Sequence, residues 1–266
     1  MNILIYFIIF CMGTVFGSFL TLATYRIPLD QDITHKRSYC PNCNHRLSFL
    51  DMIPLLSYIF LGAKCRYCKK KISPRYFIIE LLTGIAFVLL AIMLGLDVYN
   101  FNYVTVIEFI FGILYIVFIF LIAGIDIEHG KIDKRVLIYG ISISIMKIVY
   151  QYIMCTNNCQ EYNINRIIIY LIAIIIINIF SIQSKNNKYD YAYGLIITAI
   201  IMSFFTYEIT TILTVICTLL IVAIKILLYK TVNKNKKKDI KLPIAFYMSA
   251  SNAIIIFISY MYFLGR

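Results

Sequence analysis

Apolar stretches long enough to cross a lipid bilayer recur along almost the whole chain. About 30 Å of hydrocarbon requires roughly 20 apolar residues in helical conformation. Inside a bilayer the backbone must satisfy its own hydrogen bonds, so runs this long and continuous form helices. We therefore expect an all-α polytopic membrane protein with about eight transmembrane helices. The expected spans are 3–25, 76–96, 104–125, 136–154, 166–183, 191–206, 209–229 and 242–263. Because the sixth run is short, seven spans are the alternative.

The composition agrees with this fold class. Of the 266 residues, 61% are hydrophobic and only 14% are charged, whereas soluble domains carry about 25% charged residues. The first apolar run lacks a basic start and a small-residue cleavage site, so we expect a retained span rather than a signal peptide.

Basic residues predict the orientation of the spans. With the N-terminus outside, the inner segments are 26–75, 131–135, 185–188 and 225–241, and they hold 22 of the 25 lysines and arginines. This is a strong positive-inside bias. The net charge of +12 follows from this topology and from contact with anionic membrane lipid. It therefore requires no nucleic acid partner.

Four cysteines lie in the polar segment that follows the first apolar run. Cys40, Cys43, Cys65 and Cys68 form two CxxC pairs separated by 21 residues. Paired thiolates at this spacing suit tetrahedral zinc, and four thiolates leave no open position for a substrate. The predicted role of Zn²⁺ is therefore structural, in a cytoplasmic zinc-binding loop domain.

The remaining cysteines and the histidines leave alternatives open. His35 and His45 could compete as zinc ligands, although solvated loop histidines are the simpler interpretation. Cys155 and Cys159 fall in a short outer loop, where a disulfide is one option.

Acidic residues are scarce, so those that lie beside spans stand out. Asp126 ends the third expected span, and Asp190 precedes the sixth. Both lie at the inner face in the predicted topology. Two carboxylates brought together share a proton and can act as base and acid on a water molecule. The alternative is two solvated loop carboxylates. His129 is expected in the loop after Asp126.

Several motifs resemble those of type IV prepilin peptidases. They are Gly17-Ser-Phe-Leu20, Tyr25-Arg-Ile-Pro28, Cys40-Pro-Asn-Cys43, Asp51-Met-Ile-Pro54-Leu-Leu-Ser-Tyr58, Cys65-Arg-Tyr-Cys68, and Ile72-Ser-Pro-Arg-Tyr76 through Glu80-Leu-Leu-Thr-Gly84. The likeness is collinear over residues 17–84 and extends more weakly to the regions of Asp126 and Asp190. It implies a membrane aspartic protease that cuts the basic leader from prepilins and pseudopilins at the cytoplasmic face of the bacterial plasma membrane. Many such enzymes then methylate the new N-terminus with S-adenosylmethionine.

The resemblance assigns the catalytic aspartates to Asp126 and Asp190. Asp133 matches a position where the family has Asp or Asn after a proline, which is Ile132 here. The family's GxGD motif is altered, because Asn187 and Tyr189 stand in place of its two glycines.

Three domains follow from these patterns: a first transmembrane helix at 1–25, a four-cysteine zinc domain at 26–75 and a transmembrane peptidase core at 76–266. The expected partners are prepilin or pseudopilin substrates and membrane lipid. A non-catalytic relative that serves as a zinc-loop scaffold in a pilus or secretion assembly is the alternative function.

Overall fold

The computed structural model describes residues 2–34, 38–96, 102–158, 187–206, 208–232 and 242–264. The chain divides into two compact units, Met1–Val117 and Phe118–Arg266, with the boundary inside one long helix. The functional division into three domains remains a prediction.

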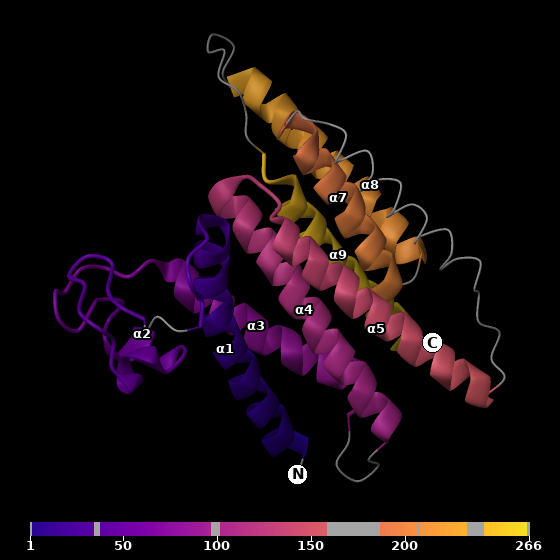
Figure 1. Ribbon diagram of the computed structural model, residues 1–266, viewed down its shortest axis with the longest axis horizontal. Coiled ribbons are helices and arrows are strands. Elements are labelled where there is room, and N and C mark those ends of the chain that lie inside the picture. Colours follow the sequence, from indigo (N-terminus) through magenta and orange to yellow (C-terminus); the bar gives the residue numbers. More distant parts are fainter. Residues whose placement is uncertain are drawn as a thin grey trace. The chain divides into compact units, whose positions relative to one another are not determined.

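The first unit is built on a pair of apolar helices, α1 (Asn2–Arg26) and α3 (Pro74–Met93), which pack along each other (Figure 1). The first half of α4 (Tyr103–His129) adds Phe109 to a buried apolar cluster with Ile9 and Phe87.

Small residues allow α1 and α3 to approach closely. A Cβ atom on Gly13 would lie 2.8 Å from the Cα of Gly84, and one on Gly17 would lie 2.7 Å from the Cα of Glu80. Real side chains do not tolerate such distances, so only glycine fits at these crossings. Helices in lipid associate mainly through such backbone contact, because burying apolar side chains gains little there.

The polar segment between α1 and α3 folds into short elements. They are the 3₁₀ turns η1 (Ile27–Leu29) and η2 (Phe49–Met52) and the one-turn helix α2 (Leu56–Phe60). A capping box formed by Ser48 and Asp51 starts η2. The cysteines flank these elements.

The second unit contains the end of α4 and the helices α5 (Lys134–Asn158), α7 (Asn187–Phe205), α8 (Glu208–Val232) and α9 (Ile244–Leu264). The helix pairs α5/α7 and α8/α9 make the most extensive contacts (Figure 1). Asn252 on α9 donates a hydrogen bond to the hydroxyl of Thr214 on α8 at 3.2 Å. Polar side chains thus join two apolar helices.

Six described helices are long and apolar enough to cross a membrane: Ile3–Leu29, Pro74–Met93, Tyr103–His129, Lys134–Met154, Ile209–Tyr229 and Ile244–Tyr262. They confirm six of the expected spans and the all-α membrane fold. The expected span 191–206 is a shorter apolar helix, Tyr191–Phe205. The expected span 166–183 lies outside the described residues, as do His35 and Cys159; the side chain of Cys155 does as well.

The expectation that His129 lies in a loop is wrong. α4 continues through Asp126 and Glu128 and ends at His129. The helix stops at Gly130, whose φ of +58° is the left-handed conformation typical of a helix end. Its N–H donates to the carbonyl of Asp126 at 2.8 Å. Asp126 therefore lies in the last turn of a helix.

Candidate functional site

Each CxxC pair forms a tight turn with the same hydrogen-bond pattern. In the first turn, Cys40 N–H donates to the carbonyl of His45 at 2.9 Å and Asn44 N–H donates to the carbonyl of Cys40 at 2.8 Å. In the second turn, Cys65 and Lys69 make the equivalent bonds at 2.9 and 3.0 Å, with Lys70 as the acceptor for Cys65. Two similar turns thus face one centre.

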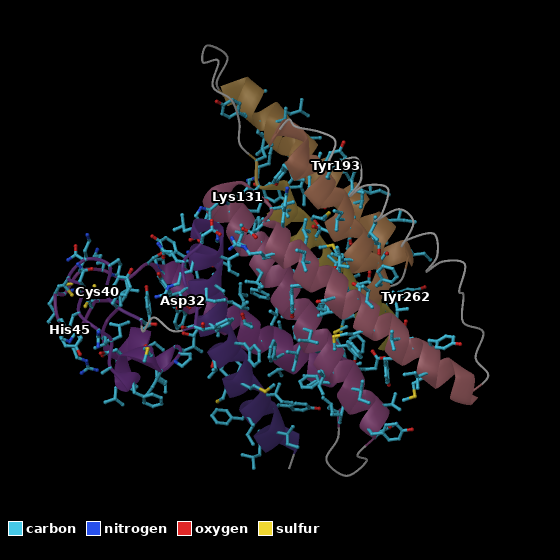
Figure 2. All side chains as sticks on the ribbon, viewed as in Figure 1. Asp32, Cys40, His45, Lys131, Tyr193 and Tyr262 are labelled. Carbon is cyan, nitrogen blue, oxygen red and sulfur yellow. The ribbon has the colours of Figure 1, made fainter. Side chains whose placement is uncertain are left out.

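The four sulfur atoms fit a zinc ion. They all lie within 4.8 Å of one another, and the Sγ atoms of Cys40 and Cys68 are 3.8 Å apart. Tetrahedral Zn–S bonds of about 2.3 Å require sulfur separations of about 3.8 Å. Figure 2 shows Cys40 and His45 in this loop. His45 stacks on Tyr67 with ring centroids 3.6 Å apart and is not a member of the cluster.

The surroundings of the cluster shift the pKa values of two of its thiols in opposite directions. The backbone N–H of Lys70 and the side-chain amide of Asn42 lower the pKa of Cys68 to about 6. The N–H of His45 acts in the same direction on Cys43, but burial and the neighbouring Cys40 and Cys68 raise the pKa of Cys43 to about 11. Neighbouring thiolates repel one another. A divalent cation at the centre of the cluster offsets this repulsion, because thiolates are its ligands.

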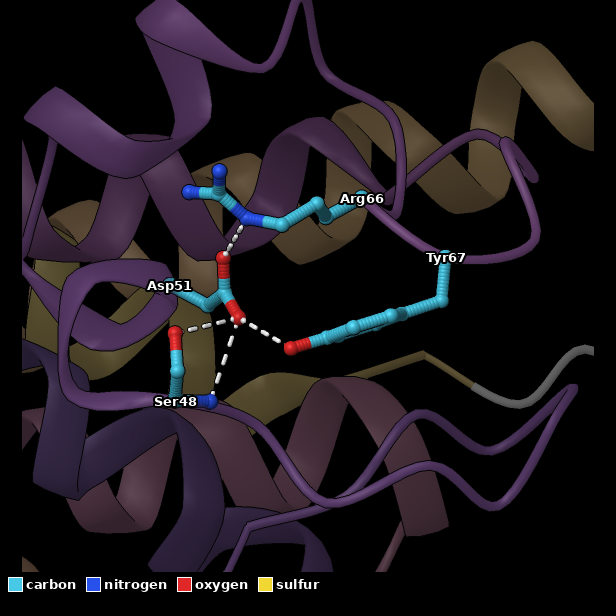
Figure 3. A network of polar contacts seen from close by, with 4 residues as sticks. All are labelled: Ser48, Asp51, Arg66 and Tyr67. Atoms are coloured by element: carbon cyan, nitrogen blue, oxygen red, sulfur yellow. Dashed lines mark hydrogen bonds and ion pairs between the residues drawn. The ribbon is translucent and has the colours of Figure 1, made fainter.

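A buried carboxylate beside the cluster ties the two halves of the loop together (Figure 3). The side chain of Asp51 is only 2% exposed. It accepts hydrogen bonds from the Ser48 hydroxyl at 2.7 Å, Arg66 Nε at 2.6 Å and the Tyr67 hydroxyl at 3.3 Å. Burial would raise the pKa of Asp51, but the bonds from Ser48 and Arg66 lower it to about 2.

Arg66 and Tyr67 are the two residues between the cysteines of the second pair, so Asp51 holds that turn in place. Sequence reasoning missed this role. One signal was available, because Asp51 is the only acidic residue between Asp32 and Glu80, in a segment rich in lysine and arginine. An isolated acid among many cations is a natural centre for ion pairing.

A second buried carboxylate, Asp126, lies in the other unit. Only 1% of Asp126 is exposed. Its Oδ1 accepts a hydrogen bond from the Tyr191 hydroxyl at 2.9 Å, and its Oδ2 accepts one from the backbone N–H of Phe246 at 3.0 Å. The carboxylate thus lies at the N-terminus of α9, where unpaired N–H groups favour negative charge.

Tyr191 connects three helices at this point. Its hydroxyl donates to Asp126 at the end of α4 and accepts from the N–H groups of Ile244 and Ala245 at 2.9 and 3.3 Å. The starts of α7 and α9 therefore meet the end of α4. Apart from the position of Tyr191 next to Asp190, no pattern in the sequence pointed to this role.

The other predicted acids have different outcomes. Asp190 lies in the first turn of α7, and its side chain is outside the described part of the structure, so its catalytic role remains a prediction. Asp133 caps the start of α5 and pairs with Arg135 at 2.9 Å. Burial raises the pKa of Asp133, but Arg135 outweighs this and lowers it.

The fold and the cysteine cluster define a class: a multi-pass helical membrane protein with a four-thiol metal site in a polar segment between its first two apolar helices. Residues 11–94 match the family model of the bacterial peptidase A24 N-terminal domain. This part of the chain is therefore similar to that N-terminal domain.

Three curated proteins also match part of the chain. The chain is 49% identical over 79 residues to a prepilin leader peptidase/N-methyltransferase of Myxococcus xanthus, covering 30% of this chain and 24% of the relative. It is 42% identical over 86 residues to the protein of the same name in Vibrio cholerae, covering 29% and 34%. For the Bacillus subtilis protein of that name the identity is 33% over 132 residues, which is half of each chain.

These matches span half or less of each relative's length. No solved structure matches the chain significantly.

Proposed function

We propose that this protein is a membrane aspartic endopeptidase that removes the basic leader from prepilin-like precursors at the cytoplasmic face of the membrane. Asp126 and Asp190 act as the pair that activates water. The observation that carries the proposal is the buried carboxylate of Asp126, bonded to the hydroxyl of the residue that follows Asp190. The match of residues 11–94 to the bacterial peptidase A24 N-terminal domain supports the same substrate class.

The carboxylate of Asp126 has acceptor sites beyond its described hydrogen bonds. An ionised carboxylate offers about four acceptor sites, and two described donors occupy one site on each oxygen. In the proposed reaction the attacking water molecule binds to these remaining acceptor sites. Asp190, with a proton, then donates to the peptide carbonyl oxygen while Asp126 takes the proton of the attacking water.

Both donors to Asp126 position its carboxylate. The Phe246 N–H belongs to the first turn of α9, and the Tyr191 hydroxyl is itself held by two N–H groups of that turn. Because both partners are fixed by helices, the carboxylate keeps one orientation without the substrate. Such preorganisation lowers the cost of reaching the transition state.

We call the four-cysteine segment, residues 26–75, the zinc loop. In this proposal the zinc loop has a structural role and lies in the cytoplasm, with the N-terminus outside. The relatives' printed names include N-methyltransferase, so the proposal extends to methylation of the new N-terminus with S-adenosylmethionine as donor. We assign no described residue to that donor.

The test uses protein reconstituted in lipid with a cognate prepilin. Asp126→Asn and Asp190→Asn should each lose cleavage by roughly 10²- to 10⁴-fold. Asp133→Asn is the matched control, because that carboxylate is engaged by Arg135, and it should retain most activity. Full cleavage by either dyad variant would exclude the pair. Mass analysis of the product detects an added methyl group.

One observation favours a second function. Asn187 and Tyr189 occupy the positions of the family's glycines, and the structure has Asp190 within a regular helix that begins at Asn187. A non-catalytic scaffold in a pilus or secretion assembly would tolerate this change. Prepilin binding without any cleavage by the parent protein would select that function.

A further inference from the structure

Six large apolar side chains of the zinc loop are exposed although this segment lies outside the spans. They belong to η2 and α2, which contact each other. We call this surface the apolar face; its members are all exposed, from Met52 at 40% to Phe60 at 82%, and they are Phe49, Leu50, Met52, Leu56, Ile59 and Phe60. Contiguous apolar surface of this kind marks an interaction site.

The face lies beside the start of a membrane span. The N–H of Leu55, which precedes α2, donates to Glu80 Oε2 at 2.8 Å. Glu80 lies six residues into α3, or about 9 Å along the helix at 1.5 Å per residue. The beginning of α2 is therefore at the depth of the first two turns of that span.

The orientation of α2 follows from its packing. Tyr58 stacks on Phe77 of α3 with centroids 5.3 Å apart and donates to the carbonyl of Ile72 at 3.5 Å. Leu56, Ile59 and Phe60 are exposed, and their spacing puts them on one side of a helical turn. One side of α2 thus packs against α3 and the residues before it, and the other side presents exposed apolar side chains.

The backbone at this junction is strained. Leu55 has a φ of +60° and a ψ of −51°, and Leu56 N–H donates to the carbonyl of Pro54 at 2.6 Å. This is a γ-turn of the rare, strained type. Strained conformations persist only where surrounding contacts fix them, and the buried Glu80 supplies that contact. The attachment of α2 to the span is therefore a defined feature of the fold.

The charge of the neighbouring residues indicates which partner binds the apolar face. Exposed cations follow α2 directly in the sequence, and they are Lys64, Arg66, Lys69, Lys70 and Lys71. Apolar side chains next to lysine and arginine are typical of segments that lie in the interface of an anionic bilayer. A basic leader, as proposed above, and a second copy of this positively charged loop would both be repelled.

We propose that the apolar face inserts into the headgroup layer of the bilayer, with the adjacent cations against anionic phospholipid headgroups. The zinc loop is then a membrane-bound element rather than a domain projecting into solvent. Attachment of the loop to lipid does not depend on the proposed cleavage.

The chain contains no tryptophan, which permits a direct test in the full-length protein. Phe60→Trp reports on the apolar face, and Tyr39→Trp, an exposed aromatic position in the first cysteine turn, is the matched control. Phe7→Trp on the exposed surface of α1 is the reference for a span. Phe49→Trp replaces Phe60→Trp if the latter loses its zinc.

The variants are reconstituted in vesicles of phosphatidylglycerol and phosphatidylcholine brominated near the headgroup. Phe60→Trp should lose most of its fluorescence and emit at shorter wavelength, whereas Tyr39→Trp should do neither. Lys64→Gln/Lys71→Gln, or vesicles without phosphatidylglycerol, should reduce the quenching of Phe60→Trp.

Equal quenching of Phe60→Trp and Tyr39→Trp would overturn the proposal. A wavelength shift of Phe60→Trp that appears only at high protein density would also overturn it, because a second copy would then cover the apolar face. A shift that appears only with an added apolar peptide would overturn it in the same way, because a peptide would then be the partner. Quenching that is the same with and without anionic lipid would overturn the role of the cations.

Discussion

The zinc loop and the site around Asp126 both hold a buried carboxylate, but they are assembled in different ways. The cross-loop contacts of the zinc loop join residues up to 28 positions apart. Asp126 binds partners 65 and 120 positions away. The first site is a local unit of one segment, and the second exists only when three helices meet.

The two sites are stabilised in different ways, one by metal binding and the other by helix packing. A metal ion can hold a short segment that lacks a core, since binding to preformed thiolates supplies folding free energy. The Asp126 site depends on the packing of apolar helices, and its polar contacts act on a framework that already exists. We therefore expect metal removal to affect the loop and leave the second unit folded.

The largest effect should follow removal of the metal ligands. Cys40→Ser/Cys65→Ser should abolish zinc binding, which contributes on the order of 10 kcal/mol in structural sites, and should make residues 38–73 sensitive to protease. Metal analysis and limited proteolysis measure this. Cys11→Ser/Cys217→Ser is the control, because neither thiol belongs to the cluster. Zinc retained by the first variant would refute the assignment of ligands.

A smaller effect is expected from Asp51→Asn. This change weakens the bonds that fix Arg66 and Tyr67 between the second pair of cysteines. Zinc affinity should therefore fall about 10- to 100-fold, as it does when other groups that orient metal ligands are removed. Competition with a chelator measures the affinity. Asp133→Asn in the second unit should leave it unchanged. An unaltered affinity in Asp51→Asn would mean that the cysteine turns hold their geometry without this carboxylate.

Tyr191→Phe tests the long-range site in the same way. It removes a hydroxyl that bonds Asp126 and the start of α9, and leaving these groups unpaired should cost about 1–3 kcal/mol. Thermal unfolding in detergent measures the loss, and zinc content should stay constant. Tyr247→Phe is the control, since it keeps the ring that faces Lys225. Equal stability of the two variants would contradict the role of Tyr191.

The smallest effect concerns the α8/α9 pair. Thr214→Val removes the acceptor for Asn252, and such bonds between membrane helices average about 0.6 kcal/mol. Thr218→Val is closely matched, because the described bond of its hydroxyl is to the carbonyl of Thr214 within α8. Unfolding of the two variants should differ by that amount. Equal unfolding free energies of the two variants would mean that packing alone holds α8 and α9 together.

Sequence reasoning succeeded where the signal is local. The apolar runs located six spans because bilayer thickness sets their length, and the spacing of Cys40, Cys43, Cys65 and Cys68 predicted a cluster that the sulfur positions fit. The end of α4 was misplaced, because the charged residues after Asp126 suggested a loop while the helix stops only at Gly130. Charge marks a membrane boundary and does not by itself end a helix.

The sequence by itself determined that this chain is helical and membrane-embedded and that it carries four cysteines spaced for a metal, because each property depends on composition or on spacing over a few residues. Only the tertiary structure decided that Asp126 bonds Tyr191 and the start of α9, that Asp51 supports the cysteine turns, and that α2 is attached to a span through Glu80. These contacts depend on which helix faces meet, and that follows from packing around positions such as Gly13 and Gly17 rather than from any local pattern.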